Sequence, residues 1–305
     1  MTGRLWILAA TATAIALSGC GGGSGGSGAT QAPPTSTSAP PAPPPPTASR
    51  FPPAPFGLTV SQHFAPLGWL YPAGSAEPQL IQSDQVPIRW SAEAGKYELS
   101  LPNVGSGFLE YRFPGENPYA FKLVSPSGTP LDVAVILDDG RFYDPAFGSV
   151  GLFEWITTGP GPSGWAAFGL QSTPADLPGH GVVRYLTFGS SVAGQGATNS
   201  IQFVFDFDNG TLSGDIGVAW ADDWGPHEVT RYDFAQTDFA RGRTTFMATF
   251  AVPGAPTEGF LTGRFMGTGA RELAVAWRGP VRNPYSGEWI IASGVVLGRV
   301  CSDCD

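Results

Sequence analysis

Apolar and polar residues alternate most regularly between residues 201 and 220, in the run IQFVFDFDNGTLSGDIGVAW. Every second residue from Ile201 to Phe207 is large and apolar, and successive side chains of a strand point to opposite faces. Asn209 and Gly210 follow, and both residue types accept the positive φ of a tight type I′ turn. An alternating run then returns to Trp220. The pattern predicts a β-hairpin, which needs neighbouring strands because a lone hairpin is marginally stable in water.

The C-terminal half supplies such neighbours, in about eight runs of strand type joined by short turns. The runs are 182–189, 200–208, 211–220, 229–238, 243–251, 258–266, 270–278 and 288–299. Up-and-down order is a common way to close an antiparallel sheet, so we expect a lipocalin-like β-barrel over residues 179–300. Large side chains at the expected inward positions predict a filled barrel: Phe203, Phe205, Phe246, Phe250, Phe260, Phe265 and Trp277. A β-sandwich is the structural alternative.

Shorter and less regular strand-like runs precede the barrel, over residues 56–178. They lie at 86–90, 96–101, 107–113, 131–137, 152–157 and 165–170, separated by Pro, Gly and Asn. No long segment has the apolar period of a helix. The fold class predicted is therefore all-β, with a smaller, irregular β subdomain ahead of the barrel and a turn-rich boundary near 174–181.

The N-terminus reads as a targeting signal. Residues 1–19 combine Arg4 with an apolar run and end in Leu17-Ser18-Gly19 before Cys20. This ending resembles the bacterial lipobox, which implies cleavage before Cys20 and acylation of that residue, with palmitate among the chains. An ordinary secretory signal is the alternative. Residues 20–55 are Gly/Ser-rich and then Pro-rich, which predicts a disordered tether; a proline-rich ligand for a partner domain is the other interpretation.

Charge and chemistry narrow the function classes. The net charge is −9, with 16 basic against 25 acidic residues, which disfavours nucleic acid as a partner. The histidines, His63, His180 and His227, are scattered, so no zinc site is predicted. No Gly-x-Ser-x-Gly elbow lies between a strand and a helix. We therefore predict no catalytic residue, no metal and no cofactor; an enzyme would need convergent acids or histidines in a cleft.

The chain ends in a Cys-x-x-Cys pair, Cys301 and Cys304. Outside the cytoplasm, and without a second pair, a local disulfide is the expected state. A thiol pair that faces a partner or a metal is the alternative.

Three blocks together resemble the barrel domain of the transferrin-binding protein B family of Gram-negative surface lipoproteins. They are FGLQSTPADLPGHGVVRYLTFGSSVAG at 168–194, FDFDNGTLSGDI at 205–216 and GRFMGTGARELAVAWRG at 263–279. The resemblance implies a barrel on a lipid-anchored protein of the outer membrane or cell surface. The family name implies capture of a host iron protein. This chain, with its single barrel and short connections, departs from large two-lobed receptors, so the resemblance does not extend to transferrin itself.

Glu272 stands in the last of these blocks, three residues after the end of the Gly267–Gly269 turn. One interpretation is a carboxylate for binding or catalysis. The favoured one is structural: its side chain accepts N–H groups of the Gly267–Gly269 turn and fixes the entry to the strand.

The segment Trp220 to Trp224 is the predicted partner-binding feature. An exposed Trp beside the acids Asp222 and Asp223 at a barrel end resembles an interface anchor. Packing of the Trp over the barrel mouth is the alternative.

Together these features predict a non-enzymatic, lipid-anchored binding protein with an extracellular protein, an iron-bearing ligand or an outer-membrane receptor as its partner. A lipocalin-like carrier of a small hydrophobic ligand is the second hypothesis. Which face of the membrane the protein occupies stays open, and the ligand is not specified.

Overall fold

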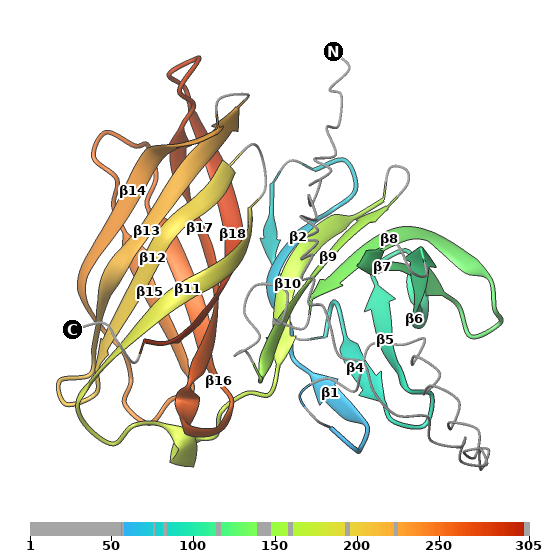
Figure 1. Cartoon of the computed structure of the whole chain (residues 1–305). Coiled ribbons are helices and arrows are strands. Elements are labelled where there is room, and N and C mark those ends of the chain that lie inside the picture. The colour runs from blue at the N-terminus through green and yellow to red at the C-terminus, as the bar shows by residue number, and fades with distance from the viewer. Residues whose placement is uncertain are drawn as a thin grey trace, which may run out of the picture. The chain divides into compact units, whose positions relative to one another are not determined.

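The computed structural model describes residues 56, 58–75, 77–81, 84–113, 117–138, 148–157, 161–192, 196–222 and 225–301. The described residues all lie within 48–305. They form β-strands in two antiparallel sheets, with short 3₁₀ turns (Figure 1). The all-β prediction is confirmed. Within this part of the chain, no helix has the length and apolarity needed to cross a membrane.

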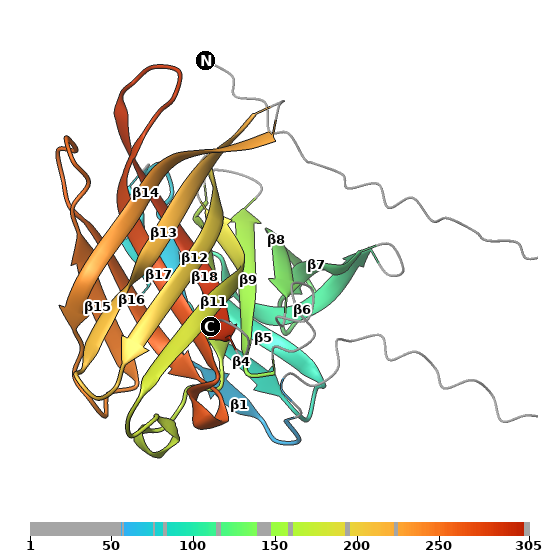
Figure 2. The ribbon, with the colours of Figure 1, turned by 60° about the vertical axis from the view of Figure 1, so that its left-hand side comes forward.

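The second sheet is the predicted eight-stranded barrel. Its strands are β11 (Val182–Val192), β12 (Gly196–Asp206), β13 (Thr211–Asp222), β14 (Gly225–Asp238), β15 (Thr245–Phe250), β16 (Gly259–Met266), β17 (Glu272–Arg282) and β18 (Trp289–Val300). Hydrogen-bonded order runs β14-β13-β12-β11-β18-β17-β16-β15. The two end strands of this order, β14 and β15, follow each other in the chain and contact each other, which curls the sheet round (Figure 2).

Aromatic side chains fill the barrel. Phe203, Phe205 and Phe265 are fully buried, and the rings of Phe205 and Phe265 lie 4.8 Å apart in an edge-to-face contact. Phe246, Phe250 and Trp277 also point inward, as predicted. The prediction for Phe260 is wrong. In β16 the inward positions are odd-numbered, so Phe260 lies on the outer wall, where it packs edge-to-face against Trp69.

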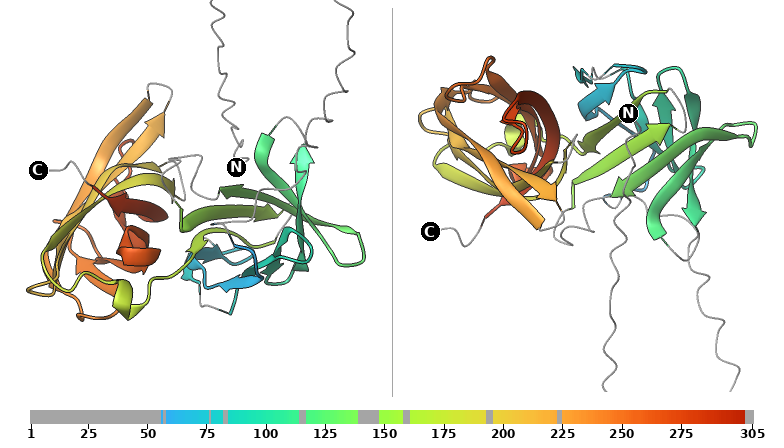
Figure 3. Two further views of the ribbon diagram at one scale, coloured as in Figure 1. Left: turned by 60° about the horizontal axis from the view of Figure 1, so that its bottom comes forward. Right: turned by 90° about the horizontal axis from the view of Figure 1, so that it is seen from above.

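The first sheet has ten strands, whereas six runs were identified in the sequence. The strands are β1 (Gln62–Phe64), β2 (Leu67–Tyr71), β3 (Gln79–Leu80), β4 (Ile88–Ser91), β5 (Lys96–Leu101), β6 (Gly105–Phe113), β7 (Asn117–Val124), β8 (Pro130–Asp138), β9 (Val150–Thr157) and β10 (Ser163–Gly169). Strands β1 to β3 are too short to carry a readable alternation. The sheet curves around its own apolar cluster, whose largest members include Trp155, Tyr97 and Phe168 (Figure 3).

A third apolar cluster joins the two sheets, and we call it the junction. It combines Leu67, Trp69, Val150, Leu152, Trp165 and Ala167 with the barrel residues Met266, Ala274, Ala276, Val295 and Leu297. Polar contacts fix its position: Trp69 Nε1 donates to Gly294 O at 3.0 Å, and Tyr71 Oη bonds Ser293 Oγ at 2.8 Å. The barrel is therefore held against the first sheet by directed bonds as well as by apolar contact.

Candidate functional site

One end of the barrel carries the start of the predicted partner-binding segment, at Trp220. Because neighbouring strands are antiparallel, β11, β13, β15 and β17 end there, and their successors begin there. We call this end the loop end. Its described connections are residues 251–258 and 283–288. The opposite end, the base, carries the 207–210 turn and the 3₁₀ turns η2 (Pro174–Asp176) and η3 (Thr268–Ala270).

The β17–β18 hairpin is the best-defined feature of the loop end. The Asn283 side chain accepts the N–H groups of Tyr285 at 2.9 Å and Ser286 at 3.2 Å. Arg282 Nε donates to Gly287 O at 3.1 Å, and Gly287 takes the positive φ of 72° that closes the turn. The hairpin is therefore shaped by its own bonds and does not need a partner to order it.

This hairpin presents apolar surface to solvent. Tyr285 is 68% exposed at its tip, and Ile290 and Ile291 are each 36% exposed on the strand that returns from it. Ile290 and Ile291 follow each other in an extended strand and so point to opposite faces, and Tyr285 at the tip is the most exposed of the three. Exposed apolar side chains on a loop whose shape is fixed are candidates for a contact surface. The sequence analysis did not identify these residues; the signal that it passed over is Asn-Pro-Tyr-Ser-Gly directly before an apolar strand.

The predicted anchor segment begins at the same end. β13 ends at Asp222, which pairs in register with Gly225, and Trp220 pairs with Gly196 and His227. Asp223 and Trp224 lie outside the described residues. A partner-binding role for Trp220, Asp222, Asp223 and Trp224 stays a prediction.

The Asn209-Gly210 hairpin exists, but its turn type differs from the prediction. Among these two residues only Gly210 has a positive φ, of 69°, so a type I′ turn is wrong. Four residues connect β12 to β13, and the Asp206 carboxylate organises them. It accepts the N–H groups of Asn209 at 2.9 Å and Asp208 at 3.0 Å, and the Asn209 side-chain amide at 2.7 Å. The hydrogen bonds from Asn209 hold the pKa of Asp206 below its ordinary value.

The partners predicted for Glu272 are also wrong. Its Oε1 accepts the N–H of Gly148 at 2.7 Å and its Oε2 that of Ser149 at 2.9 Å, so the carboxylate reaches the first sheet instead of its own Gly267–Gly269 turn. Burial raises the pKa of Glu272 against the opposing effect of these bonds. Gly267 lies beside it, with a φ of 73°, and a Cβ there would stand 2.4 Å from Ser149 Oγ. Glu272 and Gly267 thus both contribute to the contact between the barrel and the first sheet.

Two tyrosine hydroxyl groups inside the barrel form internal hydrogen bonds. Tyr185 Oη donates to Ala270 O at 2.5 Å near the base, and Tyr232 Oη donates to Pro280 O at 2.9 Å near the loop end. Burial raises the pKa of both hydroxyls. Both are thus placed as structural donors within the filled interior.

The remaining predicted positions lie at the chain ends. Cys20 and Cys304 fall outside the described residues, so lipidation and the Cys301–Cys304 disulfide stay predictions. Cys301 follows β18 and donates its backbone N–H to Arg184 O at 2.9 Å. Over the described ranges, no three residues among His, Cys, Asp and Glu group closely enough to hold a metal ion.

No protein-family model matches the sequence, and no curated protein matches it. Solved structures are similar to it at low identity. A variant of transferrin-binding protein B from Haemophilus parasuis Hp5 is 12% identical with a TM-score of 0.43, over 79% of this chain and 45% of that one. Isotype 1 transferrin-binding protein B from serogroup B Neisseria meningitidis is 12% identical with a TM-score of 0.39, over 80% and 44%.

A protein described as a surface lipoprotein is 12% identical with a TM-score of 0.35, over 77% of this chain and 99% of that one. The chain thus spans less than half the length of the two transferrin-binding proteins. The fold of this chain is therefore described from its own strand order and register.

Proposed function

We propose that this chain is a lipid-anchored envelope protein that binds a macromolecular partner through the loop end of its barrel. The observation that carries the proposal is the β17–β18 hairpin, where Tyr285 is exposed on a hydrogen-bonded turn and Ile290 and Ile291 are partly exposed on the strand that follows it. A binding loop on a rigid scaffold loses little conformational entropy when its partner docks. The aromatic filling of the barrel and the bonded junction supply that rigidity.

The proposed organisation of the chain follows the sequence. Residues 1–19 direct export, Cys20 carries the lipid, and residues 20–55 give reach from the outer membrane. Residues 56–178 and 179–300 form the two folded parts, with residues 301–305 as a disulfide-bonded tail. The family resemblance makes an iron-bearing protein the first partner to test.

A crosslinking experiment in the native host tests the loop end. Tyr285 is replaced by a photoreactive phenylalanine analogue, and Met247, which is 71% exposed on strand β15 of the barrel wall, is replaced in a matched control. Irradiation of cells incubated with iron-loaded transferrin, or with serum, should give a crosslinked protein adduct from position 285 and none from 247. Adducts of equal yield from both positions, or none from 285, would contradict the proposal.

The anchor is tested separately, because it can fail while the binding surface stands. Labelled palmitate should mark the wild-type protein in its host and should not mark Cys20→Ser, which we expect to be released from the membrane fraction. Equal labelling of both proteins would show that Cys20 is not the acylated residue.

A further inference from the structure

A groove with a volume of about 310 Å³ lies on the outer face of the first sheet. Its lining comes from strands β1, β4, β5 and β6 and comprises His63, Pro87, Ile88, Arg89, Glu98, Ser100 and Ser106. None of these strands contributes to the junction or to the barrel. The groove is thus separate from the loop end, and its volume suits a small ligand.

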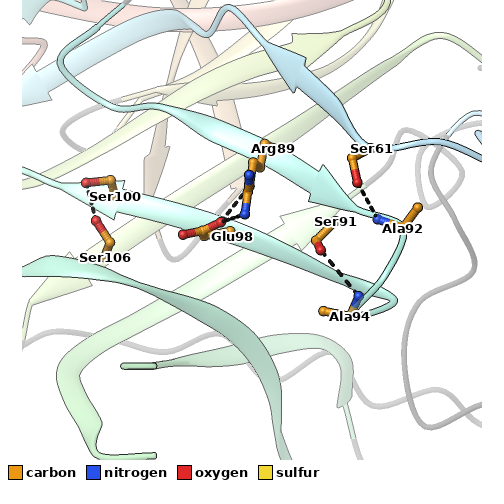
Figure 4. A network of polar contacts seen from close by, with 8 residues as sticks. All are labelled: Ser61, Arg89, Ser91, Ala92, Ala94, Glu98, Ser100 and Ser106. Carbon is orange, nitrogen blue, oxygen red and sulfur yellow. Dashed lines mark hydrogen bonds and ion pairs between the residues drawn. The ribbon is translucent and has the colours of Figure 1, made fainter. Parts of the chain in front are cut away.

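The polar side chains of the groove are already positioned (Figure 4). Arg89 donates through both Nε and Nη2 to one oxygen of Glu98, Oε2, at 2.6 Å. Ser106 donates its hydroxyl to Ser100 at 2.8 Å. The strands beneath are fixed as well, since Ser100 donates its backbone N–H to Pro87 O at 3.0 Å. A ligand would therefore meet side chains whose directions are set before binding.

Some hydrogen-bond donors and acceptors of the groove side chains remain available to a ligand. Within the described part of the chain, Glu98 Oε1 and Arg89 Nη1 have no hydrogen-bond partner. Because Ser106 is the donor in the serine pair, the Ser100 proton remains to be donated. The groove thus offers a charged acceptor, a charged donor and a hydroxyl within one small space.

This combination selects among ligand classes. The Glu98 carboxylate beside the guanidinium opposes a bare anion such as phosphate. A pair of neighbouring hydroxyl groups fits better, because each hydroxyl both donates and accepts: one can donate to Glu98 Oε1 while the other accepts from Arg89. Pro87, which lines the groove, offers apolar surface for the carbon face of a sugar ring.

We propose that this groove binds a saccharide, with Glu98 and Arg89 holding neighbouring hydroxyl groups and Ser100 donating to a third oxygen. The site is independent of the loop end, so failure of the partner-binding proposal leaves it untouched, and the reverse also holds.

Saturation-transfer NMR on the full chain tests the site. The probes are D-glucose, D-galactose, D-mannose, N-acetyl-D-glucosamine and L-fucose, each titrated alone and then against inorganic phosphate and glycine betaine. We expect at least one sugar to receive saturation on the ring protons beside its vicinal hydroxyls. Glu98→Gln and Ser100→Ala should each weaken its affinity about tenfold, because the first replaces the charged acceptor with a neutral amide and the second removes the hydroxyl donor.

Lys96→Gln is the matched control. Lys96 pairs with Glu110 at 2.8 Å on the first sheet but does not line the groove, so sugar affinity should be unchanged. Thermal unfolding of each variant shows whether it folds, and Ser100→Ala leaves the Arg89–Glu98 ion pair intact if Glu98→Gln does not fold. No saturation on any sugar, equal weakening in Lys96→Gln, or displacement of the sugar by equimolar phosphate or betaine would each overturn the proposal.

Discussion

Glu272 shows how one side chain can connect two sheets. It stands 124 positions from Gly148 in the sequence, yet its carboxylate accepts two consecutive backbone N–H groups from the segment that leads into β9. These groups lie at the start of a buried strand, where an unpaired N–H is costly. The residue is only 6% exposed, so water cannot readily replace the carboxylate.

Replacing Glu272 with alanine should therefore reduce the free energy of unfolding by about 2–4 kcal/mol, because two buried donors lose their acceptor. Glu272→Gln should lose less, since one amide oxygen can still accept. Urea unfolding followed by tryptophan fluorescence measures both variants.

Glu258→Ala is the control for this measurement. Glu258 is exposed just ahead of β16, and its replacement should change the free energy of unfolding by less than about 0.5 kcal/mol. A loss in Glu272→Ala no larger than that in Glu258→Ala would show that the carboxylate does not hold the sheets together.

At the scale of elements, the 207–210 turn depends on the residue just before it. The turn does not have the type I′ geometry of a tight hairpin. Instead, the Asp206 carboxylate accepts the backbone N–H groups of Asp208 and Asn209. Such side-chain bonds let the chain reverse direction with only Gly210 in the left-handed region. The turn between β12 and β13 is thus stabilised by an aspartate to which the sequence analysis assigned no role.

Asp206→Ala should lower stability, and the effect should depend on pH. Because hydrogen bonds from Asn209 hold the folded-state pKa of Asp206 below its ordinary value, the carboxylate stabilises the fold above the unfolded-state pKa of about 3.9. This contribution disappears as the pH falls through the lower folded-state pKa. The stability difference between wild type and Asp206→Ala should thus be constant near neutral pH and shrink in acid.

Denaturant titrations from neutral to acidic pH measure that difference. Asp233→Ala serves as the control, because Asp233 is exposed on β14 and makes no such bonds among the described residues. A pH-independent difference for Asp206→Ala would argue against the turn mechanism.

The whole molecule is organised by two apolar interiors and the junction between them. Phe205 occupies the centre of the barrel cluster, with ring contacts to Phe246 and Phe265 at 4.8 Å each. A cavity for a hydrophobic ligand would have to open where these rings meet. The structure therefore favours a scaffold over a lipocalin-like carrier.

The aromatic packing inside the barrel leads to two expected results. Phe205→Ala should destabilise the protein by about 3–5 kcal/mol in urea unfolding, whereas Met247→Ala, on the outer wall, should have little effect. A fluorescent fatty acid titrated into the wild-type protein should not bind. Stoichiometric binding of that probe would favour the carrier hypothesis instead.

Sequence alone predicted the barrel well because strands such as β12 alternate regularly between large apolar and other residues. The same rule failed for Phe260, since both faces of β16 are covered, one by the barrel interior and the other by the junction. The partners of Glu272 could not be predicted, because no local pattern records a contact with Gly148. The exposure of Tyr285 could not be predicted either, because it depends on the position of the hairpin tip in the folded protein.

The β17–β18 turn at the loop end can accept a longer sequence without disturbing the barrel. The turn at Asn283 closes on its own bonds, and the wall register of β17 and β18 is set by pairs further down the strands. Lengthening the connection between Pro284 and Gly287 would cost little loop entropy and would leave the wall as it is. A foreign peptide grafted there would be displayed to solvent, so this end can accept insertions while the barrel wall beneath it stays constant.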